Sequence, residues 1–530
     1  MTQRTIRPEG TSLDISAAEM QELSARVTQL VTEYFSEVST LPVFPNTSAG
    51  KTAHEIAAAL PQDGERLEQL IDDCRTIIQN SRHNGHPRFF GYVASPANPA
   101  GVFADLIASA LNANVTSWRS GPAATEIEHK VIEWLALLIG YGDSSLPAFG
   151  LLTSGGSMAN LIALMMAHRS HAAPDVSSTG LWNVSAPMTL YASDQVHMSI
   201  PKAADILGLG RAQVRLIPCD DRFRMNVKFL RETLAADLQS GLRPFCVIAS
   251  AGTVNTGAVD PLDDIAAVAH EFKLWFHIDG AYGALAALDE TKRPLFRGIE
   301  QADSISLDPH KWLYVPIDSG CLLFRDEARA CAAFSFDSAD YIKVHERNAA
   351  EAFAFWNYGP ELSRRFRALK IWLTLRYYGM QRLARTIAED LAIAAYLGER
   401  VQAAADFELL AAPQLSICCF RYVPEPLATQ SQSLAANGES SAEINAQLDQ
   451  LNTNIMNAVQ RGGRAYLSSA VSTASLPCAR ASQIFALRAP ILMRRSILSA
   501  QPRERISPRI SADGARITKC GSVRNNDCWG

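Results

Sequence analysis

The sequence predicts an α/β fold with a mostly parallel central sheet and a smaller α+β domain toward the C-terminal end. Between residues 101 and 395, short apolar or β-prone runs alternate with helical patterns. That alternation is typical of a parallel sheet covered by helices. The chain has 530 residues, which is too long for one ordinary core. Two or three domains are therefore expected.

Four regions can be distinguished along the chain. Residues 1–100 carry apolar side chains at helical spacing, interrupted by prolines, and are predicted to form a helical N-terminal segment. Residues 101–395 form the predicted large α/β domain, and residues 396–495 the small α+β domain. Residues 496–530 are rich in Arg, Ser and Gly and lack helical periodicity. This basic stretch is interpreted as a disordered tail or as the product of a shifted reading frame, with a nucleic-acid-binding tail as the functional alternative.

Composition narrows the class of protein. Hydrophobic residues make up 48%, charged residues 19%, and the net charge is −5, which is ordinary for a soluble enzyme and does not indicate a nucleic-acid partner. No run of 18 uncharged apolar residues occurs and the N-terminus has no apolar signal region, so no membrane span is expected. Ten scattered cysteines without metal-ligand spacing predict reduced thiols, a cytoplasmic location and no metal site.

The predicted strands of the large domain direct attention to the residues that follow them. Four of these runs are FCVIAS (245–250), LWFHIDG (274–280), SISLD (304–308) and GCLLFRD (320–326). Ligands of such sheets bind at the carboxyl ends of the strands. The positions of interest are therefore Ser250, Asp279 and the turn from Asp308 to Lys311.

The segment TSGGSMANL (153–161) predicts a phosphate site. An apolar run enters Thr-Ser-Gly-Gly-Ser and continues as a helix. Glycines allow close approach of backbone N–H groups, and the N-terminus of a helix attracts anions. Gly155, Gly156 and the Ser157 hydroxyl are the candidate ligands. A plain helix N-cap is the alternative interpretation.

Two further side chains have a functional and a structural interpretation. Asp279, after an apolar strand, can hold a protonated ring nitrogen or a metal, or it can cap a loop; the absence of other carboxylates nearby in the sequence disfavours the metal. His197 follows a short strand-like run and can stack on a cofactor ring, although a lone histidine is more often structural.

Lys311 lies in the apolar segment SISLDPHKWLYVP (304–316). Lysine is almost never buried unless it is paired or chemically used. A lysine in a partly desolvated site can form a Schiff base with an aldehyde. A phosphate-binding helix start, an aspartate at a strand end and such a lysine together match pyridoxal phosphate, which has a phosphate, a pyridine nitrogen and an aldehyde.

The chain resembles the pyridoxal-phosphate-dependent group II amino acid decarboxylases, and within them the aromatic-L-amino-acid decarboxylases. Residues 15–470 carry the resemblance. The matching motifs are HPRFFGYVASPANPAG (86–101), SWRSGPAATEIE (117–128), TSGGSMANL (153–161), SDQVHMSIPKAA (193–204), HIDGAYG (277–283), DPHKW (308–312) and YGPELSRRFRALKIWLTLRYYG (358–379).

The resemblance implies a fold and a set of roles. The fold is that of the pyridoxal-phosphate-dependent transferases, the aspartate aminotransferase fold of type I. The enzyme is a homodimer whose N-terminal segment packs on the partner, with the active site at the subunit interface. Lys311 binds the cofactor aldehyde, Asp279 pairs with the pyridine nitrogen, and His197 stacks on the ring and assists proton transfer. His310 lies near the phosphate, and Ser250 stands where the family usually has threonine.

The resemblance also implies a role for Tyr341. FDSADYIKVHER (336–347) is similar to the family's mobile loop, in which a tyrosine protonates the carbanion after carbon dioxide leaves. The related aldehyde synthases have phenylalanine there and carry out oxidative deamination. Tyr341 therefore favours decarboxylation of an L-amino acid to its amine.

The substrate is less well defined by the sequence. The motifs favour an aromatic amino acid such as Tyr, DOPA, Trp or Phe. Phe89 and Tyr92 are candidates for an aromatic wall, and Ser95, Asn114 and Thr116 complete the candidate substrate residues. The polar Asn114 and Thr116 leave an aliphatic or acidic substrate open. A cofactor-binding but inactive homologue is the non-enzymatic alternative, because the chain departs from the family after about residue 470.

Overall fold

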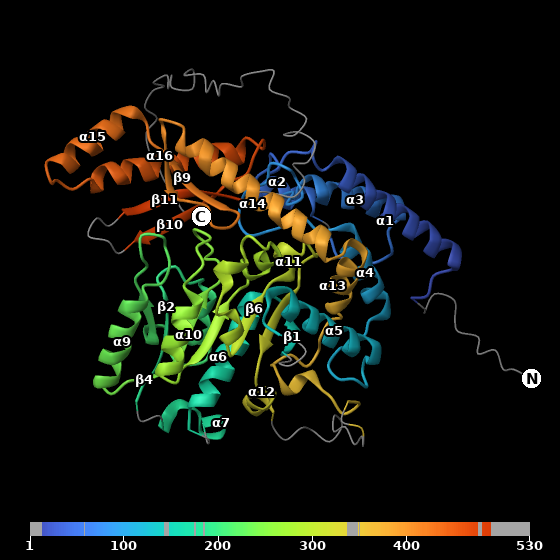
Figure 1. The fold of residues 1–530 in the computed structure, drawn as a ribbon. Helices are drawn as coiled ribbons and strands as arrows, with labels where there is room; N and C mark the ends of the chain where they lie inside the picture. Colours follow the sequence, from blue (N-terminus) through green and yellow to red (C-terminus); the bar gives the residue numbers. More distant parts are fainter. Residues whose placement is uncertain are drawn as a thin grey trace, which may run out of the picture. The chain divides into compact units, whose positions relative to one another are not determined.

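A mixed seven-stranded sheet forms the centre of the large domain (Figure 1). The structure is a computed structural model that describes residues 13–57, 59–142, 148–173, 176–183, 186–335, 348, 350–474 and 480–488. The strands are β1 (Phe149–Thr153), β2 (Met188–Ser193), β3 (Val214–Ile217), β4 (Arg243–Ser250), β5 (Trp275–Asp279), β6 (Ser304–Leu307) and β7 (Gly320–Phe324). Their order is β1-β7-β6-β5-β4-β2-β3.

Five neighbouring strands, from β6 to β3, are parallel, and β7 runs antiparallel between β6 and β1. The predicted α/β fold with a mostly parallel sheet is confirmed, although the alternation of elements did not predict the reversed direction of β7. Because β1 is antiparallel to β7, its carboxyl end lies at the same edge as those of β4, β5 and β6.

Helices cover this sheet and connect its strands. They are α4 (Pro99–Leu111), α5 (Pro122–Ile139), α6 (Gly156–His171), α7 (Val176–Thr179), α8 (Ser199–Ile206), α9 (Val227–Gln239), α10 (Leu262–Glu271), α11 (Pro309–Trp312), α12 (Glu327–Phe334) and α13 (Ala368–Tyr378). Helix α6 packs against β4, β5, β6 and β7 and also contacts α8. Its first turn therefore starts beside the strand ends from which the candidate site residues come.

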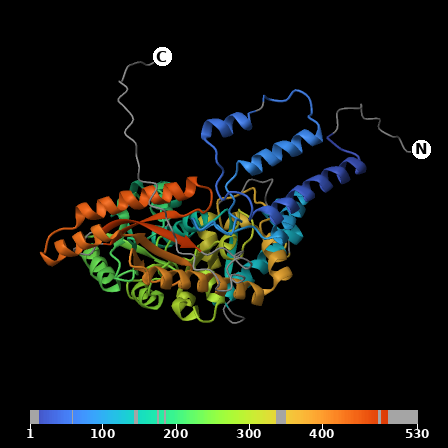
Figure 2. The ribbon, with the colours of Figure 1, turned by 90° about the horizontal axis from the view of Figure 1, so that it is seen from above.

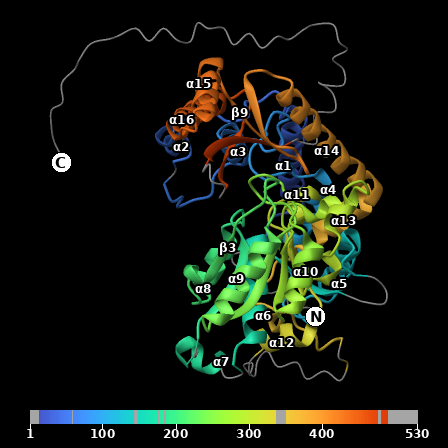
Figure 3. The ribbon, with the colours of Figure 1, turned by 60° about the vertical axis from the view of Figure 1, so that its left-hand side comes forward.

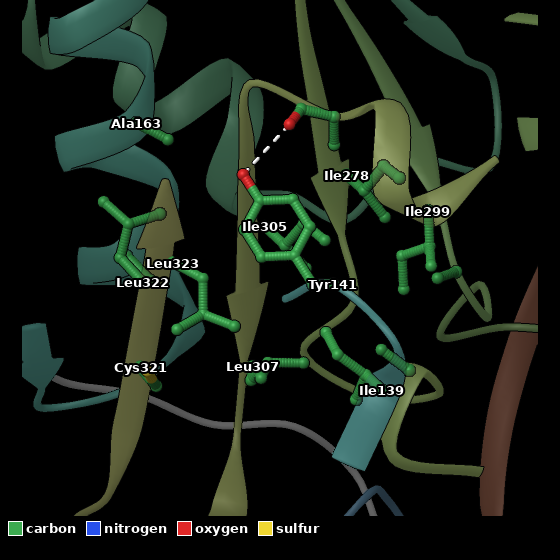
Figure 4. Packing of buried hydrophobic residues seen from close by; sticks show 14 of the residues in the cluster. Ile139, Tyr141, Ala163, Ile278, Ile299, Ile305, Leu307, Cys321, Leu322 and Leu323 are labelled. Atoms are coloured by element: carbon green, nitrogen blue, oxygen red, sulfur yellow. Dashed lines mark hydrogen bonds between the residues drawn. The ribbon is translucent and has the colours of Figure 1, made fainter. Parts of the chain in front are cut away.

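Alternating residues of β6 explain how the sheet is buried on both faces (Figure 4). Ile305 and Leu307 lie on the face that packs against Ile139, and both are fully buried. Tyr141 lies on the same face and donates a hydrogen bond from its hydroxyl to the Ala302 carbonyl at 2.9 Å. The residues between them, such as Ser306, face α6 instead. This second face carries the polar groups of the site.

A four-stranded antiparallel sheet follows in the sequence, with the order β10-β11-β9-β8. Its elements are α14 (Met380–Gln402), β8 (Phe407–Ala411), β9 (Ile417–Tyr422), α15 (Glu425–Ala436), α16 (Ala442–Arg461), β10 (Ser468–Ala474) and β11 (Arg480–Arg488). Figure 3 shows this sheet between α16 and α14, and both helices contact β9 and β11. The small α+β fold predicted for the C-terminal part is confirmed in the residues that are described.

The N-terminal residues form α1 (Ala17–Glu37), α2 (Ala49–Glu55) and α3 (Leu67–Gln79). Helices α1 and α3 lie side by side (Figure 2). Ser16 caps α1, since its hydroxyl accepts from Glu19 N at 3.2 Å and the Glu19 carboxylate accepts from Ser16 N at 2.8 Å. None of the residues of α1 is buried. The helix is well formed but has little to pack against within the chain.

The described residues all belong to one unit, residues 1–491. The predicted tail of residues 496–530 and the predicted proton donor Tyr341 lie outside the described residues. Within the described part, no helix combines the length and the apolar character needed to cross a bilayer. Each cysteine described is a free thiol.

Candidate active site

A cavity of about 470 Å³ lies at the carboxyl edge of the central sheet. Eight predicted cofactor residues line it although they come from five separate segments of the chain: Gly155, Gly156, Ser157, His197, Ser250, Asp279, His310 and Lys311. The cavity therefore brings together every residue that the sequence predicts for the cofactor.

The turn between β1 and α6 forms one end of the cavity. Gly155 has φ +151°, a backbone conformation that side chains rarely adopt. A Cβ atom on Gly156 would lie 2.7 Å from Ala281 Cβ and 3.0 Å from Asp308 Oδ2. Both glycines are thus required by backbone geometry or by close packing, and the first N–H groups of α6 begin at this point. These features fit the binding of a phosphate group at the start of α6.

Gly156→Ala is expected to weaken cofactor binding by roughly tenfold, because overpacking at a tight contact shifts the backbone at a cost of about 1–3 kcal/mol. Titration of the purified apoprotein with pyridoxal phosphate measures the change. Gly64→Ala is the matched control, since a Cβ at Gly64 meets nothing within 4 Å. Equal affinities in the two variants would contradict the role of Gly156.

Lys311 lies in the single-turn helix α11, just after β6. Its Nζ forms an ion pair with Asp308 Oδ2 at 2.7 Å. The Asp308 side chain is 4% exposed and that of Lys311 is 18% exposed. Lys311 therefore points its amine into the cavity at a fixed position, and does not extend to solvent.

Asp279 ends β5 and presents its carboxylate at the same edge. Its Oδ2 accepts from Asn160 Nδ2 at 2.9 Å. Its Oδ1 accepts from Ser306 Oγ and from the Ala281 backbone N–H, each at 3.2 Å. Three donors hold this carboxylate in one orientation, which is suited to a cationic group such as a protonated ring nitrogen.

Two histidines line the cavity in surroundings that disfavour the charged form of their rings. Burial lowers the pKa of His197 and is the largest influence on it, and burial likewise lowers the pKa of His310. The Ser319 backbone N–H donates to His310 Nδ1 at 3.2 Å. That contact leaves the His310 proton on Nε2.

Ser250 ends β4 in register with Asp279. Its backbone N–H donates to Asp260 Oδ2 at 2.7 Å. The Asp260 carboxyl is buried, and burial raises its pKa to about 6. Asp260 thus fixes the end of β4, and with it the position of the Ser250 hydroxyl at the cavity.

Of the predicted substrate residues, one lines the cavity and the others do not. Tyr92 lines the cavity, with φ +55° and its hydroxyl 3.2 Å from that of Tyr466. Phe89 is buried and stacks on Tyr466 with ring centroids 5.3 Å apart, and it does not line the cavity. The Arg82 guanidinium lies over the rings of Phe89 and Tyr92, at 5.0 Å from each ring centroid. Tyr92 is therefore the aromatic residue that is placed to meet a ligand.

Ser95, Asn114 and Thr116 do not line the cavity. Ser95 Oγ donates to the His310 carbonyl at 2.8 Å and also contacts the Lys311 carbonyl, so it supports the lysine turn. Asn114 Oδ1 accepts from the Arg364 backbone N–H at 2.8 Å, and Thr116 is buried. Within one chain, Asn114 and Thr116 therefore contribute to packing and hydrogen bonding inside the protein and not to the cavity wall.

Three polar residues that the structure connects to the site were given no role from the sequence, although one of them, Asp308, lies in the turn singled out above. Asp308 stands three residues before Lys311, a spacing at which side chains meet on one helical turn. His277 stands two residues before Asp279 on β5, so both face α6. Asn160 follows Gly156 by one helical turn. These spacings are the features of the sequence that could have indicated the three residues.

The fold and the cavity define an enzyme that holds an aldehyde cofactor on a lysine at the carboxyl edge of a mixed sheet. Residues 50–423 match the pyridoxal-dependent decarboxylase conserved domain. The chain belongs to this family, and it is a pyridoxal-phosphate-dependent amino acid decarboxylase.

Individual relatives differ in their substrates. The chain is 35% identical to an aromatic-L-amino-acid decarboxylase of Bacillus atrophaeus, over 82% of this chain and 88% of the relative. It is 34% identical to the cysteine sulfinic acid decarboxylase of Mus musculus, over 71% and 75% of the two chains. The crystal structure of Oryza sativa TDC with PLP and tryptamine aligns with a TM-score of 0.80 and 27% identity, covering 92% of this chain and 95% of that one.

The residues of this chain fit the cofactor. Asp308 Oδ1 is buried and has no hydrogen-bond partner among the described residues, so the cavity contains an unsatisfied acceptor. Such an atom is expected to gain a donor when a ligand binds. The glycine turn, the Asp279 carboxylate and the Lys311 amine are chemically complementary to the phosphate, the ring nitrogen and the aldehyde of pyridoxal phosphate.

Proposed function

We propose that this enzyme decarboxylates a neutral, aromatic L-amino acid to its amine. The observation that carries the proposal is the composition of the cavity wall. Lys311 is the only lysine or arginine among the described lining residues, and it is committed to the cofactor. Tyr92, Val93 and Ile317 provide aromatic and apolar surface. An acidic substrate side chain would have to be desolvated there without a cationic partner.

Each residue of the site has a role in this reaction. When bound, pyridoxal phosphate supplies a ring that withdraws electrons from the bond to the substrate carboxylate. Lys311 would hold the cofactor by its aldehyde. Asp279 would pair with the ring nitrogen, and His197 would stack on the ring. The Tyr341 hydroxyl delivers the proton that replaces the carboxylate on Cα.

Release of carbon dioxide from a panel of amino acids tests the proposal. Trp, Tyr, DOPA and Phe are expected to be turned over with kcat/KM at least about 100-fold above that for Glu, Asp and cysteine sulfinate, because an unpaired buried charge costs several kcal/mol. The acidic class is the second candidate, since a relative named for an acidic substrate is 34% identical. Preference for the acidic amino acids would overturn the proposed substrate.

Tyr341→Phe is expected to change the product of the aromatic substrate from amine to aldehyde, with release of ammonia and hydrogen peroxide. The phenylalanine ring fills the same space but has no proton to give to Cα, so that oxygen can react there instead. Amine formation is expected to fall by roughly 10²-fold or more, as on loss of a general acid. Peroxide and amine are assayed together; unchanged amine formation would remove Tyr341 from the proton transfer. Tyr377→Phe is the matched control, since Tyr377 is 73% exposed.

We infer that the enzyme is a homodimer in the cytoplasm. Exposed apolar side chains gather on α1 and α4, and they include Met20, Leu23, Val27, Phe103, Leu106, Ile107 and Leu111. Several exposed apolar side chains on one helix are typical of a surface that another subunit covers. The free thiols of the described cysteines favour a reducing compartment.

Leu106→Glu is expected to raise the dimer dissociation constant by roughly 100-fold or more, because the variant places a charge in a desolvated interface. Leu106 is 62% exposed in the single chain, so the same change leaves the fold of the monomer intact. Sedimentation velocity across a concentration series measures the shift. Leu238→Glu, on the exposed face of α9, is the matched control. A monomeric wild-type enzyme would contradict the dimer.

A further inference from the structure

Asn160 is a buried residue whose hydrogen bonds connect two side chains of the cavity, Asp279 and His197. It is 1% exposed and lies in the first turns of α6. Its Nδ2 donates to Asp279 Oδ2 and to Ser199 Oγ, each at 2.9 Å. Its Oδ1 lies 3.0 Å from His277 Nε2. Both N–H groups and one lone pair of the amide oxygen are thus directed at three buried side chains.

The chemistry of Asp279 and His277 determines which end of the Asn160 amide group faces each of them. An ionised carboxylate only accepts, so the Asn160 amide must turn its nitrogen to Asp279 and its oxygen to His277. His277 Nε2 must therefore carry the proton. His277 Nδ1 lies 2.9 Å from Ser304 Oγ and 3.1 Å from the Ser304 carbonyl oxygen, and Ser304 Oγ accepts from Trp275 Nε1 at 2.9 Å. Burial lowers the pKa of His277 to about 4, in agreement with a neutral ring.

The other branch of the network reaches His197. Ser199 Oγ accepts one amide proton of Asn160, so its own hydroxyl proton is available to His197 Nδ1 at 2.8 Å. The Ser199 backbone N–H also donates to this nitrogen, at 3.2 Å. With two donors on Nδ1, the proton of the neutral His197 ring must lie on Nε2.

We propose that Asn160 is a positioning residue that acts through its neighbours: it orients the Asp279 carboxylate directly, and through the Ser199 hydroxyl it strengthens the Nε2–H tautomer of His197 that the Ser199 backbone N–H also favours. The roles of Asp279 and His197 in the reaction rest on the proposed function, whereas the tautomer of His197 does not. Had Asn160 been a donor to His277, its oxygen would face the Asp279 carboxylate. The orientation of the Asn160 amide group therefore connects the position of Asp279 to the tautomer of His197.

Asn160→Asp tests the proposal with almost no change in shape. The new carboxylate cannot donate to Asp279, and it accepts the Ser199 hydroxyl proton that His197 otherwise receives. Affinity for pyridoxal phosphate is expected to fall by roughly 10- to 100-fold, the range for loss of a hydrogen bond to a charged group. With the preferred amino acid, kcat is expected to fall by a similar factor while KM changes by less than about threefold, because the lost contacts act on the reacting cofactor and not on the substrate side chain.

The tautomer itself is read without cofactor or substrate. In the full-length ligand-free protein labelled with ¹⁵N-histidine, His197 is expected to show the Nε2–H pattern of chemical shifts, assigned by its loss in His197→Gln. In Asn160→Asp the pattern is expected to move toward a mixture of tautomers. Should that variant fail to fold, Ser199→Ala removes the same hydroxyl and is expected to produce the same movement.

Asn452→Asp is the matched control. Asn452 is also buried and donates through Nδ2 to the carbonyls of Tyr422 and Leu448, at the small sheet. It is expected to lower the unfolding temperature and to leave the affinity for pyridoxal phosphate and the His197 signals unchanged. If Asn160→Asp behaves in the same way, Asn160 is only structural and the proposal is wrong. If wild-type enzyme turns over no amino acid but the His197 tautomer still depends on Asn160, the proposed function fails and the positioning of His197 stands.

Discussion

Lys311→Ala is expected to abolish covalent retention of pyridoxal phosphate and to lower kcat by roughly 10³-fold or more. A tethered amine reacts at an effective concentration far above that of any free amine, and no other described lysine lines the cavity. Borohydride reduction followed by mass analysis of peptides should find the cofactor on Lys311 in the wild type and on no residue in the variant. An adduct of equal yield elsewhere in the variant would remove Lys311 from its role.

The control for this variant has to separate chemistry from the loss of a buried ion pair. Lys311→Ala leaves the buried Asp308 carboxylate without its partner, which destabilises a fold by about 3–5 kcal/mol in other proteins. Lys370→Ala removes a fully buried amine that lies 3.1 Å from the Asp105 carboxylate, which retains Arg365 as a second partner at 3.3 Å. Both variants are therefore expected to unfold at lower temperature, but only Lys311→Ala should lose the adduct. Loss of the adduct in both would point to unfolding and not to chemistry.

The site could be predicted from the sequence to the extent that it follows from strand ends. Ser250, Asp279 and Lys311 each follow a short apolar run, and parallel strands bring their carboxyl ends to one edge. The same logic places Gly155, since β1 also ends at that edge. These residues needed only the type and direction of the elements, which local patterns supply.

Contacts between side chains could not be predicted in the same way. The Asn160–Asp279 hydrogen bond depends on how α6 is rotated over β5, which packing of the whole sheet decides. The stacking of Phe89 on Tyr466 joins a residue of the N-terminal segment to one that lies just before β10. From the sequence alone, an apolar or aromatic residue near a motif can equally well line the substrate pocket or pack in the core. Only its packing partner, such as Tyr466 for Phe89, distinguishes the two. For the same reason the sequence indicated the class of cofactor more firmly than the substrate.

Asp279→Asn is expected to lower kcat on the order of 10²-fold or more, the effect of removing one preorganised electrostatic partner from an active site. The neutral amide cannot balance a positive ring nitrogen, so the ring withdraws electrons less effectively. In either orientation the new amide places its NH2 group against a donor, which is Asn160 Nδ2 on one side and the Ala281 N–H and Ser306 Oγ on the other. Weaker cofactor affinity and an altered visible spectrum of the bound cofactor should therefore accompany the loss of rate.

The matched control for Asp279→Asn is Asp303→Asn, at the opposite end of the sheet. The Asp303 carboxylate accepts from the Phe276 backbone N–H at 2.8 Å, and burial raises its pKa. Asparagine can still accept that bond, so stability is expected to change little and kcat to change by less than about threefold. Because both aspartates sit at ends of adjacent strands, β5 and β6, a loss of rate confined to position 279 separates charge at the ring nitrogen from charge elsewhere in the sheet. A variant at position 279 that retained wild-type kcat and spectrum would show that the ring nitrogen does not depend on this carboxylate.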